Sequence, residues 1–211
     1  MIGADTEASG LDLNGIGAPN AGFDNPVLQS QAMYRKLLGA MAQPGRILSC
    51  ELSLDVPTPL WPTTAAAALT LLDFDTPLWL NPGAAAAHAL GDYLRFHCGC
   101  PLVEAIGNAA FAIISDPAEL PPLDSFAAGT DEYPDRSATL LIQVERLDDS
   151  RGVILRGPGI ECKQTFQAKG LPQGFWQQVQ ENHAGFPRGV DMIFCAQDRI
   201  AALPRSTQVE V

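Results

Sequence analysis

Short apolar runs of strand length alternate with helical segments along this chain, and that alternation limits the folds that it can adopt. Strands are expected at 46–54, 77–80, 110–115, 138–147, 152–156, 190–196 and 200–203. Helices are expected between them, at 26–43, 63–72, 84–96 and 174–183. Short buried strands with helices between them are typical of a layered α/β domain. We therefore expect an α/β/α sandwich around a mixed central sheet.

The chain has 211 residues, of which 46% are hydrophobic, so it is long enough to enclose one substantial core. Residues 1–24 are rich in Gly, Ala, Asp and Asn without a hydrophobic period, which predicts a flexible N-terminal tail. Asn25 and Pro26 then combine a preferred helix N-cap with a preferred first helical residue. We therefore expect a single domain at 25–211.

Charge and cysteine content exclude several classes of protein. The 24 acidic and 13 basic side chains give a net charge of −11, which repels nucleic acid. The five cysteines are an odd number, and Cys98 and Cys100 are the one close pair, too few ligands for a zinc site or an iron–sulfur cluster. No apolar stretch reaches the ~18 residues that span a bilayer. We expect a cytoplasmic protein that binds no metal, nucleic acid or membrane.

A C-terminal hairpin gives the best chemical clue. Two apolar runs flank a polar turn at Gln197-Asp198, and pairing across this turn brings Arg188 near Thr207 with Arg205 at the same end. Two guanidinium groups with hydroxyl donors beside them suit an anion with several oxygens, such as phosphate, phosphonate or a partner carboxylate.

A structural explanation of the same arginines is equally compatible with the spacing. Arg188 or Arg205 can pair with Asp191 or Glu210 and hold the end of the hairpin together. A slip of one residue in the pairing would also change which side chains share a face. Both interpretations stay open at this point.

The chain lacks the common catalytic motifs: it has no phosphate-binding loop, no zinc-protease motif, no nucleophile elbow and no dinucleotide fingerprint. His88, His97 and His183 stand outside any recognisable motif. Arg95 and His97 end the expected 84–96 helix, where the helix dipole favours cations, so a structural role suffices to explain them. We leave the catalytic residues unassigned.

A series of motifs resembles a known family. They include Phe186-Pro187-Arg188-Gly189 and Leu203-Pro204-Arg205-Ser206-Thr207, and the others lie at 34–38, 40–45, 71–73, 75–80, 94–97, 137–144 and 155–160. In order and spacing they are similar to the PhnH family of phosphonate-metabolism proteins, from about Asn25 to the end of the chain. Ser206 stands where a second Thr is common in that family, and Cys100 where Ala is frequent.

The resemblance implies a function and a set of partners. Such a protein is a subunit of the carbon-phosphorus lyase core complex, a transferase assembly that moves a phosphonate onto the ribose of ATP with loss of adenine, giving a ribose 1-phosphonate 5-triphosphate. It forms a homodimer in isolation and joins other core subunits. A purely structural assembly subunit and a stand-alone phosphate- or phosphonate-binding protein are the alternatives.

The resemblance also bears on cofactors and site residues. The family is similar in fold to pyridoxal-phosphate transferases but is not expected to bind that cofactor, and none of the three lysines here has a recognisable Schiff-base setting. A separate radical iron–sulfur subunit of the system cleaves the carbon–phosphorus bond, so no cluster is expected in this chain. The candidates for anion binding are the matched polar residues Arg95, His97, Arg188, Asp191, Arg205 and Thr207.

Overall fold

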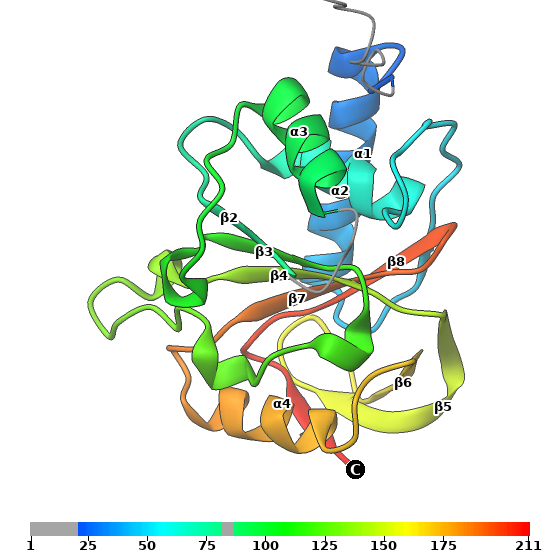
Figure 1. The fold of residues 1–211 in the computed structure, drawn as a ribbon. Helices are drawn as coiled ribbons and strands as arrows, with labels where there is room; N and C mark the ends of the chain where they lie inside the picture. The colour runs from blue at the N-terminus through cyan, green and yellow to red at the C-terminus, as the bar shows by residue number, and fades with distance from the viewer. Residues whose placement is uncertain (1–20, 82–86) are drawn as a thin grey trace, which may run out of the picture.

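A six-stranded mixed sheet forms the centre of the protein (Figure 1). The computed structural model describes residues 21–81 and 87–211. In spatial order the strands are β1 (Leu48–Ser49), β8 (Arg199–Leu203), β7 (Asp191–Cys195), β4 (Thr139–Gln143), β3 (Phe111–Ile114) and β2 (Leu78–Leu80). Strands β2, β3, β4 and β7 are parallel, β8 is antiparallel to β7, and β1 is antiparallel to β8. The expected α/β class and mixed central sheet are confirmed.

Three helices cover one face of this sheet: α1 (Pro26–Ala42), α2 (Pro62–Leu71) and α3 (Ala87–Cys98). The side chain of Asn25 accepts a hydrogen bond from the N–H of Leu28, so the predicted N-cap of α1 is confirmed. Met33 and Leu37 of α1 and Leu94 of α3 are buried in one cluster with residues of the sheet. Of the helix expected at 84–96, residues 84–86 lie outside the described part of the chain.

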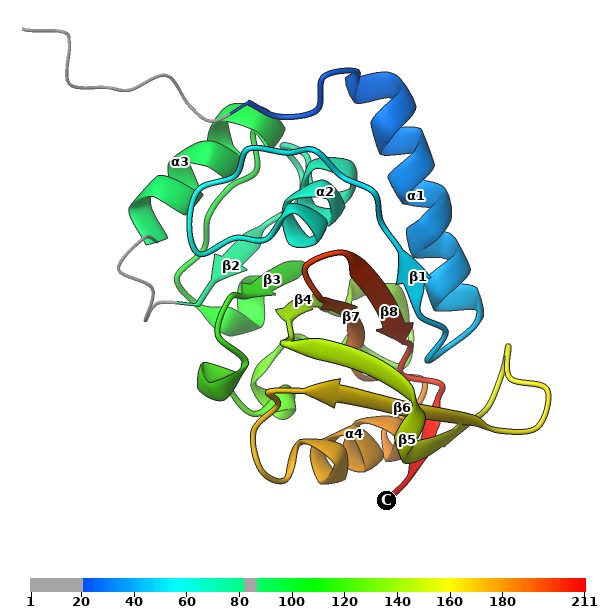
Figure 2. The same ribbon diagram turned by 90° about the vertical axis from the view of Figure 1, so that its right-hand side faces the viewer.

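The other face carries a small antiparallel sheet and one helix (Figure 2). Strand β5 (Arg146–Arg156) pairs with β6 (Gln164–Lys169) and with β9 (Gln208–Glu210), and α4 (Phe175–Ala184) lies beside them. Phe166 of β6, Phe175 of α4 and Phe194 of β7 pack ring against ring. This second layer is therefore part sheet and part helix, which the sequence did not predict.

One strand prediction is wrong. The runs at 138–147 and 152–156 were expected to be adjacent strands, but β4 belongs to the central sheet and β5 to the small sheet. Strand β5 also continues through the polar stretch 148–151, with a shift of register between Asp148 and Val153. Arg146 and Arg151 both approach the Asp148 carboxylate, at 3.5 Å each. These polar side chains make the stretch look like a turn in the sequence.

Several boundaries also differ from the predictions. Strand β1 is shorter than the expected 46–54 run, and α3 ends at Cys98 rather than near Phe96. Helix α2 begins at Pro62 with Trp61 as its N-cap, one residue before the expected range 63–72, and the Thr63 hydroxyl bonds to the carbonyl oxygen of Ala196. The long connection between β3 and β4 contains three short 3-10 helices. In the described part of the chain the 3-10 helices are η2 (Ile106–Asn108), η3 (Pro117–Glu119), η4 (Leu123–Ser125) and η5 (Pro134–Arg136).

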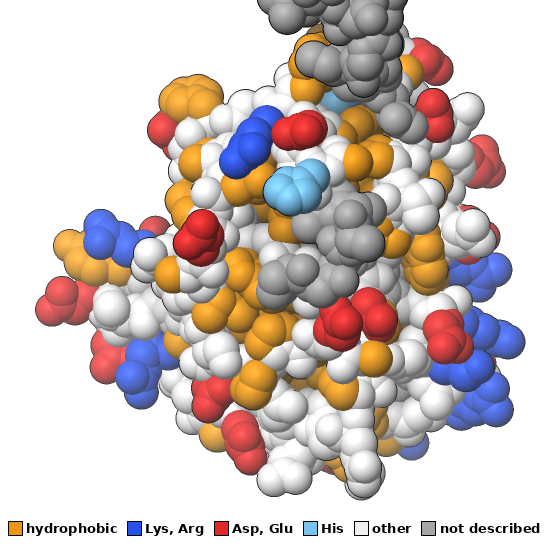
Figure 3. Space-filling view, viewed as in Figure 1, with side chains coloured by type: hydrophobic (Ala, Val, Ile, Leu, Met, Phe, Trp, Pro, Cys, Tyr) orange, Lys and Arg blue, Asp and Glu red, His pale blue; other side chains and the backbone are white. Residues whose placement is uncertain are grey.

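Both hydrophobic clusters are built on the central sheet, one on each face. This arrangement is compatible with one domain; the boundary at residue 25 stays a prediction, because residues 1–20 lie outside the described part. Within the described ranges no helix is long and apolar enough to cross a bilayer. On the face in Figure 3 the largest group of Lys and Arg side chains gathers at the right-hand edge, near β5, while acidic side chains are scattered.

Candidate functional site

The C-terminal hairpin has the predicted register. Met192 lies opposite Leu203 and Cys195 opposite Ile200, so β7 and β8 turn at Gln197-Asp198 as expected. Asp191 and Arg205 therefore meet at the open end of the hairpin. The parallel strands β2, β3, β4 and β7 all begin at this edge of the sheet, which we call the amino edge.

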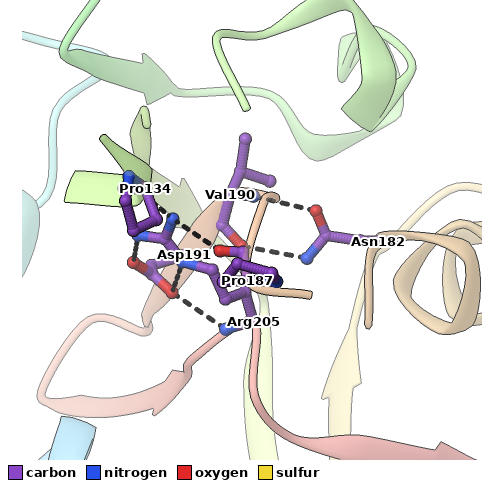
Figure 4. Close-up of polar contacts among 6 residues, drawn as sticks. All are labelled: Pro134, Asn182, Pro187, Val190, Asp191 and Arg205. Atoms are coloured by element: carbon purple, nitrogen blue, oxygen red, sulfur yellow. Dashed lines mark hydrogen bonds and ion pairs between the residues drawn. The ribbon is translucent and has the colours of Figure 1, made fainter. Parts of the chain in front are cut away.

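The Arg205 guanidinium joins three segments at the amino edge (Figure 4). Its Nη2 lies 2.6 Å from Oδ2 of Asp191 and its Nε lies 3.2 Å from Oδ1, so the two side chains meet fork to fork. Its Nη1 donates to the carbonyl oxygen of Pro134 at 2.5 Å and to that of Pro187 at 3.5 Å. The side chains of Arg205 and Asp191 are only 15% and 14% exposed. Arg205 thus acts as a clamp between η5, the loop before β7 and the hairpin.

Asn182 of α4 makes a second set of contacts at this edge. Its Nδ2 donates to the carbonyl oxygen of Val190 at 3.0 Å, and its Oδ1 accepts from the Val190 N–H at 2.8 Å. Nδ1 of His183 lies 3.0 Å from the carbonyl oxygen of Arg205. These contacts fix α4 against the start of β7. Sequence reasoning missed Asn182, since nothing in its local pattern distinguishes it from a solvated helix residue.

Arg188 is placed differently from Arg205. Its Nε lies 3.2 Å from Oδ1 of Asp131, and the two side chains are 55% and 79% exposed. Arg188 also lines a pocket of about 340 Å³ together with Asp124, Gln178 and Glu181. The guanidinium therefore remains accessible to solvent. Of the two arginines, Arg188 is the one that an external anion can reach without breaking a buried ion pair.

The other predicted residues are distributed over separate elements. Thr207 is buried, and its hydroxyl has no hydrogen-bond partner in the described part of the chain. Arg95 and His97 lie on α3, in the helical layer, where Arg95 forms an exposed ion pair with Asp92 and the His97 ring packs against Tyr93. The structure thus brings Asp191 and Arg205 together, and holds Arg95 and His97 on another element with other partners. Anion binding by any of these residues stays a prediction.

A cleft of about 490 Å³ opens at the amino edge, beside the clamp. Its lining includes Asp135, Phe186, Pro204, Arg205 and Ser206. Arg205 is its one cation, and that charge is balanced by Asp191. With Asp135 added, the lining carries a net negative charge. This cleft therefore offers an anion no unpaired positive group.

The opposite edge of the sheet is covered at the ends of β4 and β7. In open α/β sheets, ligands usually bind beyond the carboxyl ends of the parallel strands. Here residues 57–64, which we call the strap, cross the ends of β4 and β7. Gln143, at the end of β4, accepts from the Trp61 N–H at 2.7 Å and donates to the carbonyl oxygen of Pro59 at 3.0 Å. The Thr63 hydroxyl donates to the carbonyl oxygen of Ala196, after β7, at 2.5 Å.

Groups with shifted pKa values lie away from the amino edge. Burial raises the pKa of the Tyr93 phenol and that of the Cys195 thiol, each to about 12. A hydrogen bond between the thiols of Cys98 and Cys100 raises the pKa of Cys98 and lowers that of Cys100. Burial and thiol pairing account for these shifts, so they reflect packing. Among residues 21–81 and 87–211, no group of three or more His, Cys, Asp or Glu side chains is placed to hold a metal ion.

Fold and site together define an α/β protein whose central charged pair joins loops to strands. The chain belongs to the PhnH family: the family model described as bacterial phosphonate metabolism protein (PhnH) matches residues 21–210. It is 38% identical over 188 residues to the α-D-ribose 1-methylphosphonate 5-triphosphate synthase subunit PhnH of Rhizobium meliloti (strain 1021), covering 89% of this chain and 94% of the relative. It is 31% identical over 189 residues to the putative C-P lyase subunit protein HtxG of Stutzerimonas stutzeri, covering 87% of each. The resemblance seen in the sequence is confirmed.

Proposed function

We propose that this chain is a subunit of a carbon-phosphorus lyase core complex and assists the transfer of a phosphonate to the ribose of ATP, with loss of adenine. The observation that carries the proposal is the 38% identity to a named synthase subunit, which extends over 94% of that relative. A match of this extent leaves little of the relative without a counterpart here.

Within the complex, we propose that the chain positions partners or substrate and does not catalyse the reaction alone. Two features support this role. The strap is hydrogen-bonded to Gln143 at the carboxyl end of β4, and the Arg205 guanidinium is already paired with Asp191. Neither the Gln143 amide nor the Arg205 guanidinium is therefore free to stabilise charge on a reacting substrate.

The test is to purify the tagged core complex with and without this chain and to measure phosphonate-dependent release of adenine from ATP. We expect adenine release to fall to background without the chain and to return when the purified chain is added back. Unchanged release in its absence would contradict the proposal. Loss of the other subunits from the purified complex, reversed by adding the chain, would assign it the purely structural role.

A stand-alone anion-binding protein is the second candidate, and the solvent-exposed Arg188 fork favours it. Arg188→Ala in the complex tests whether this arginine binds substrate. If Arg188 binds substrate, the KM of the complex for phosphonate or ATP rises by about tenfold, as expected for one charge-assisted contact. Arg199→Ala is the matched control, because Arg199 also forms an exposed ion pair, with Asp198. Equal kinetics for both variants would exclude Arg188 from substrate binding.

We further propose that the isolated chain forms a homodimer and that it meets the other core subunits in the complex. Support comes from α1, whose outer side exposes Val27, Tyr34 and Leu38 at helical spacing, with exposed fractions of 78%, 47% and 51%. Light scattering on Leu38→Glu tests this: a change from dimer to monomer supports the role of α1. A dimer that persists in Leu38→Glu and in Tyr34→Glu would exclude this surface.

The proposal includes a cytoplasmic protein that works without pyridoxal phosphate or an iron–sulfur cluster, in a fold related to that of pyridoxal-phosphate transferases. The mixed sheet beneath a helical layer supports the fold relation. Lys36 donates to the carbonyl oxygen of Ser49 at 2.5 Å, and Lys169 lies 3.0 Å from Glu145, which ties both amines to surface partners. The five cysteines, all in the described ranges, form no disulfide, which suits a reducing compartment.

A further inference from the structure

At the right of Figure 2 the turn after α1 meets the loop between β5 and β6. A pocket of about 310 Å³ opens between them. One wall comes from Gln43, Pro44 and Arg46, and the other from residues 159–164. The pocket is distinct from the amino-edge cleft, although Gly159 contributes to both.

Two cations line this pocket against a single acid. Nη1 of Arg46 donates to Oε1 of Gln43 at 2.5 Å and forms no ion pair with any residue that the structure describes. Lys163 makes neither a hydrogen bond nor an ion pair within the described ranges. Glu161 is the one carboxylate of the lining. The lining therefore carries a net positive charge, in a chain whose net charge is −11.

Close backbone packing holds the two walls together. A Cβ on Gly159, whose φ is +82°, would lie 2.0 Å from the carbonyl oxygen of Ala42, so the loop and the end of α1 touch directly. Nη1 of Arg156 donates to the carbonyl oxygen of Cys162 at 3.0 Å, and its Nε lies 2.6 Å from Glu210. These contacts anchor the loop to β5 and β9. Arg46 and Lys163 are thus presented from two walls that are fixed relative to each other.

Two unpaired cations in a polar pocket favour one class of ligand. An Arg fork makes paired hydrogen bonds to phosphate-type oxygens, and a Lys ammonium adds a point charge beside it. We propose that this pocket binds an anion with at least two negative charges on phosphate or phosphonate oxygens, and that an oligophosphate, which can reach both cations, binds more tightly than a single phosphate group. The proposal goes beyond the proposed function and does not require the chain to be a synthase subunit.

The experiment is calorimetric titration of the full chain at an ionic strength of about 0.15 M, where distant charges are screened, with inorganic phosphate, methylphosphonate, tripolyphosphate and ATP. We expect tripolyphosphate and ATP to bind more tightly than the two single-group anions. Arg46→Ala and Lys163→Ala should each weaken tripolyphosphate binding by about tenfold or more, because each removes a charge-assisted contact.

Arg151→Ala is the matched control. Arg151 is an exposed arginine of β5 outside the pocket, paired with Asp148, so this variant removes the same formal charge elsewhere. It should change the affinity by less than about twofold, the effect of a screened distant charge. Equal loss of tripolyphosphate affinity in Arg151→Ala and Lys163→Ala would show that the anion is attracted non-specifically by charge, and would overturn the proposal.

Absence of tripolyphosphate binding to the wild type would also overturn the proposal. If Arg46→Ala and Lys163→Ala then still prevented assembly with the other core subunits, the pocket would be a docking point for an acidic protein segment instead. The titration uses the chain alone and the adenine-release assay uses the complex. Failure of this site and failure of the proposed function are therefore measured separately.

Discussion

Asp191 receives three hydrogen bonds from Arg205, two from the guanidinium and one from the backbone N–H. Removing the guanidinium leaves a largely buried carboxylate without its charge partner. We expect Arg205→Ala to lower the free energy of unfolding by about 3 kcal/mol, the cost of breaking a buried pair from one side. Urea denaturation measures this change. Arg199→Ala, which breaks an exposed pair, should cost less than about 1 kcal/mol, and equal losses would mean that the clamp is no stronger than a surface contact.

At the opposite edge of the sheet, the Gln143 side chain should stabilise the fold as Arg205 does at the amino edge. Gln143→Leu leaves the Trp61 N–H and the carbonyl oxygens of Pro59 and Ser115 without their partner. We expect a loss of at least about 2 kcal/mol in the free energy of unfolding, because unsatisfied buried polar groups are costly. Gln177→Leu, an exposed position on α4, is the control and should change stability by less than about 0.5 kcal/mol. A small effect at Gln143 would mean that water replaces the amide.

Substitutions at two glycines with similar φ angles, Gly159 and Gly174, distinguish the cost of a steric clash from the cost of backbone strain. Gly174 has a φ of +79° and open space within 4 Å of where a Cβ would lie, whereas a Cβ at Gly159 would meet the carbonyl oxygen of Ala42. Gly174→Ala should therefore cost about 1 kcal/mol, from the left-handed conformation alone. Gly159→Ala should cost about 1–3 kcal/mol more, from the added overlap. Thermal and chemical unfolding of both variants measure the difference, and equal costs would show that the loop moves freely away from α1.

The raised pKa of Tyr93 predicts that the stability of the fold decreases at alkaline pH. Its pKa of about 12 in the folded protein exceeds the ordinary value of 10.0, so the unfolded chain ionises first as the pH rises. Tyr93 therefore contributes fully to stability below pH 10.0, and this contribution is lost between pH 10.0 and about 12. Tyr93→Phe should remove this part of the alkaline loss, measured as the difference in unfolding free energy from wild type across that range.

At neutral pH the same variant should change stability by less than about 1 kcal/mol, because the buried Tyr93 hydroxyl has no hydrogen-bond partner in the described residues. Tyr34→Phe, which removes an exposed phenol from α1, is the control. A large loss of stability at neutral pH would contradict the structure, since it would mean that the Tyr93 hydroxyl is bonded.

Local patterns were enough to predict the helices and the C-terminal hairpin. Asn25 and Pro26 mark the start of α1 because capping depends on neighbouring residues, and the register of β7 with β8 follows from one short turn. From that register the pairing of Arg205 with Asp191 was one of two interpretations of the sequence. The structure shows this contact, while its effect on anion binding stays a prediction.

Contacts between distant segments could not be predicted in this way. Arg205 bonds Pro134, 71 positions earlier, and Gln143 bonds Trp61, 82 positions earlier. Neither spacing leaves a periodic signal. The polar stretch inside β5 looked like a turn because Asp149, Ser150 and Arg151 are exposed polar residues, and Gln164–Lys169 has too many polar residues to stand out as a strand. The sequence therefore predicted the elements of the centre better than those of the second layer.

The strap has a consequence for how this protein can take part in chemistry. A metabolite approaching the ends of β4 and β7 would have to separate Trp61 and Pro59 from Gln143 before it reached the sheet, and would uncover buried polar atoms in doing so. The protein itself therefore blocks the approach to these two strand ends, a common substrate route in open α/β sheets. Ligands and partners of this protein are therefore expected at its outer surfaces, away from the ends of β4 and β7.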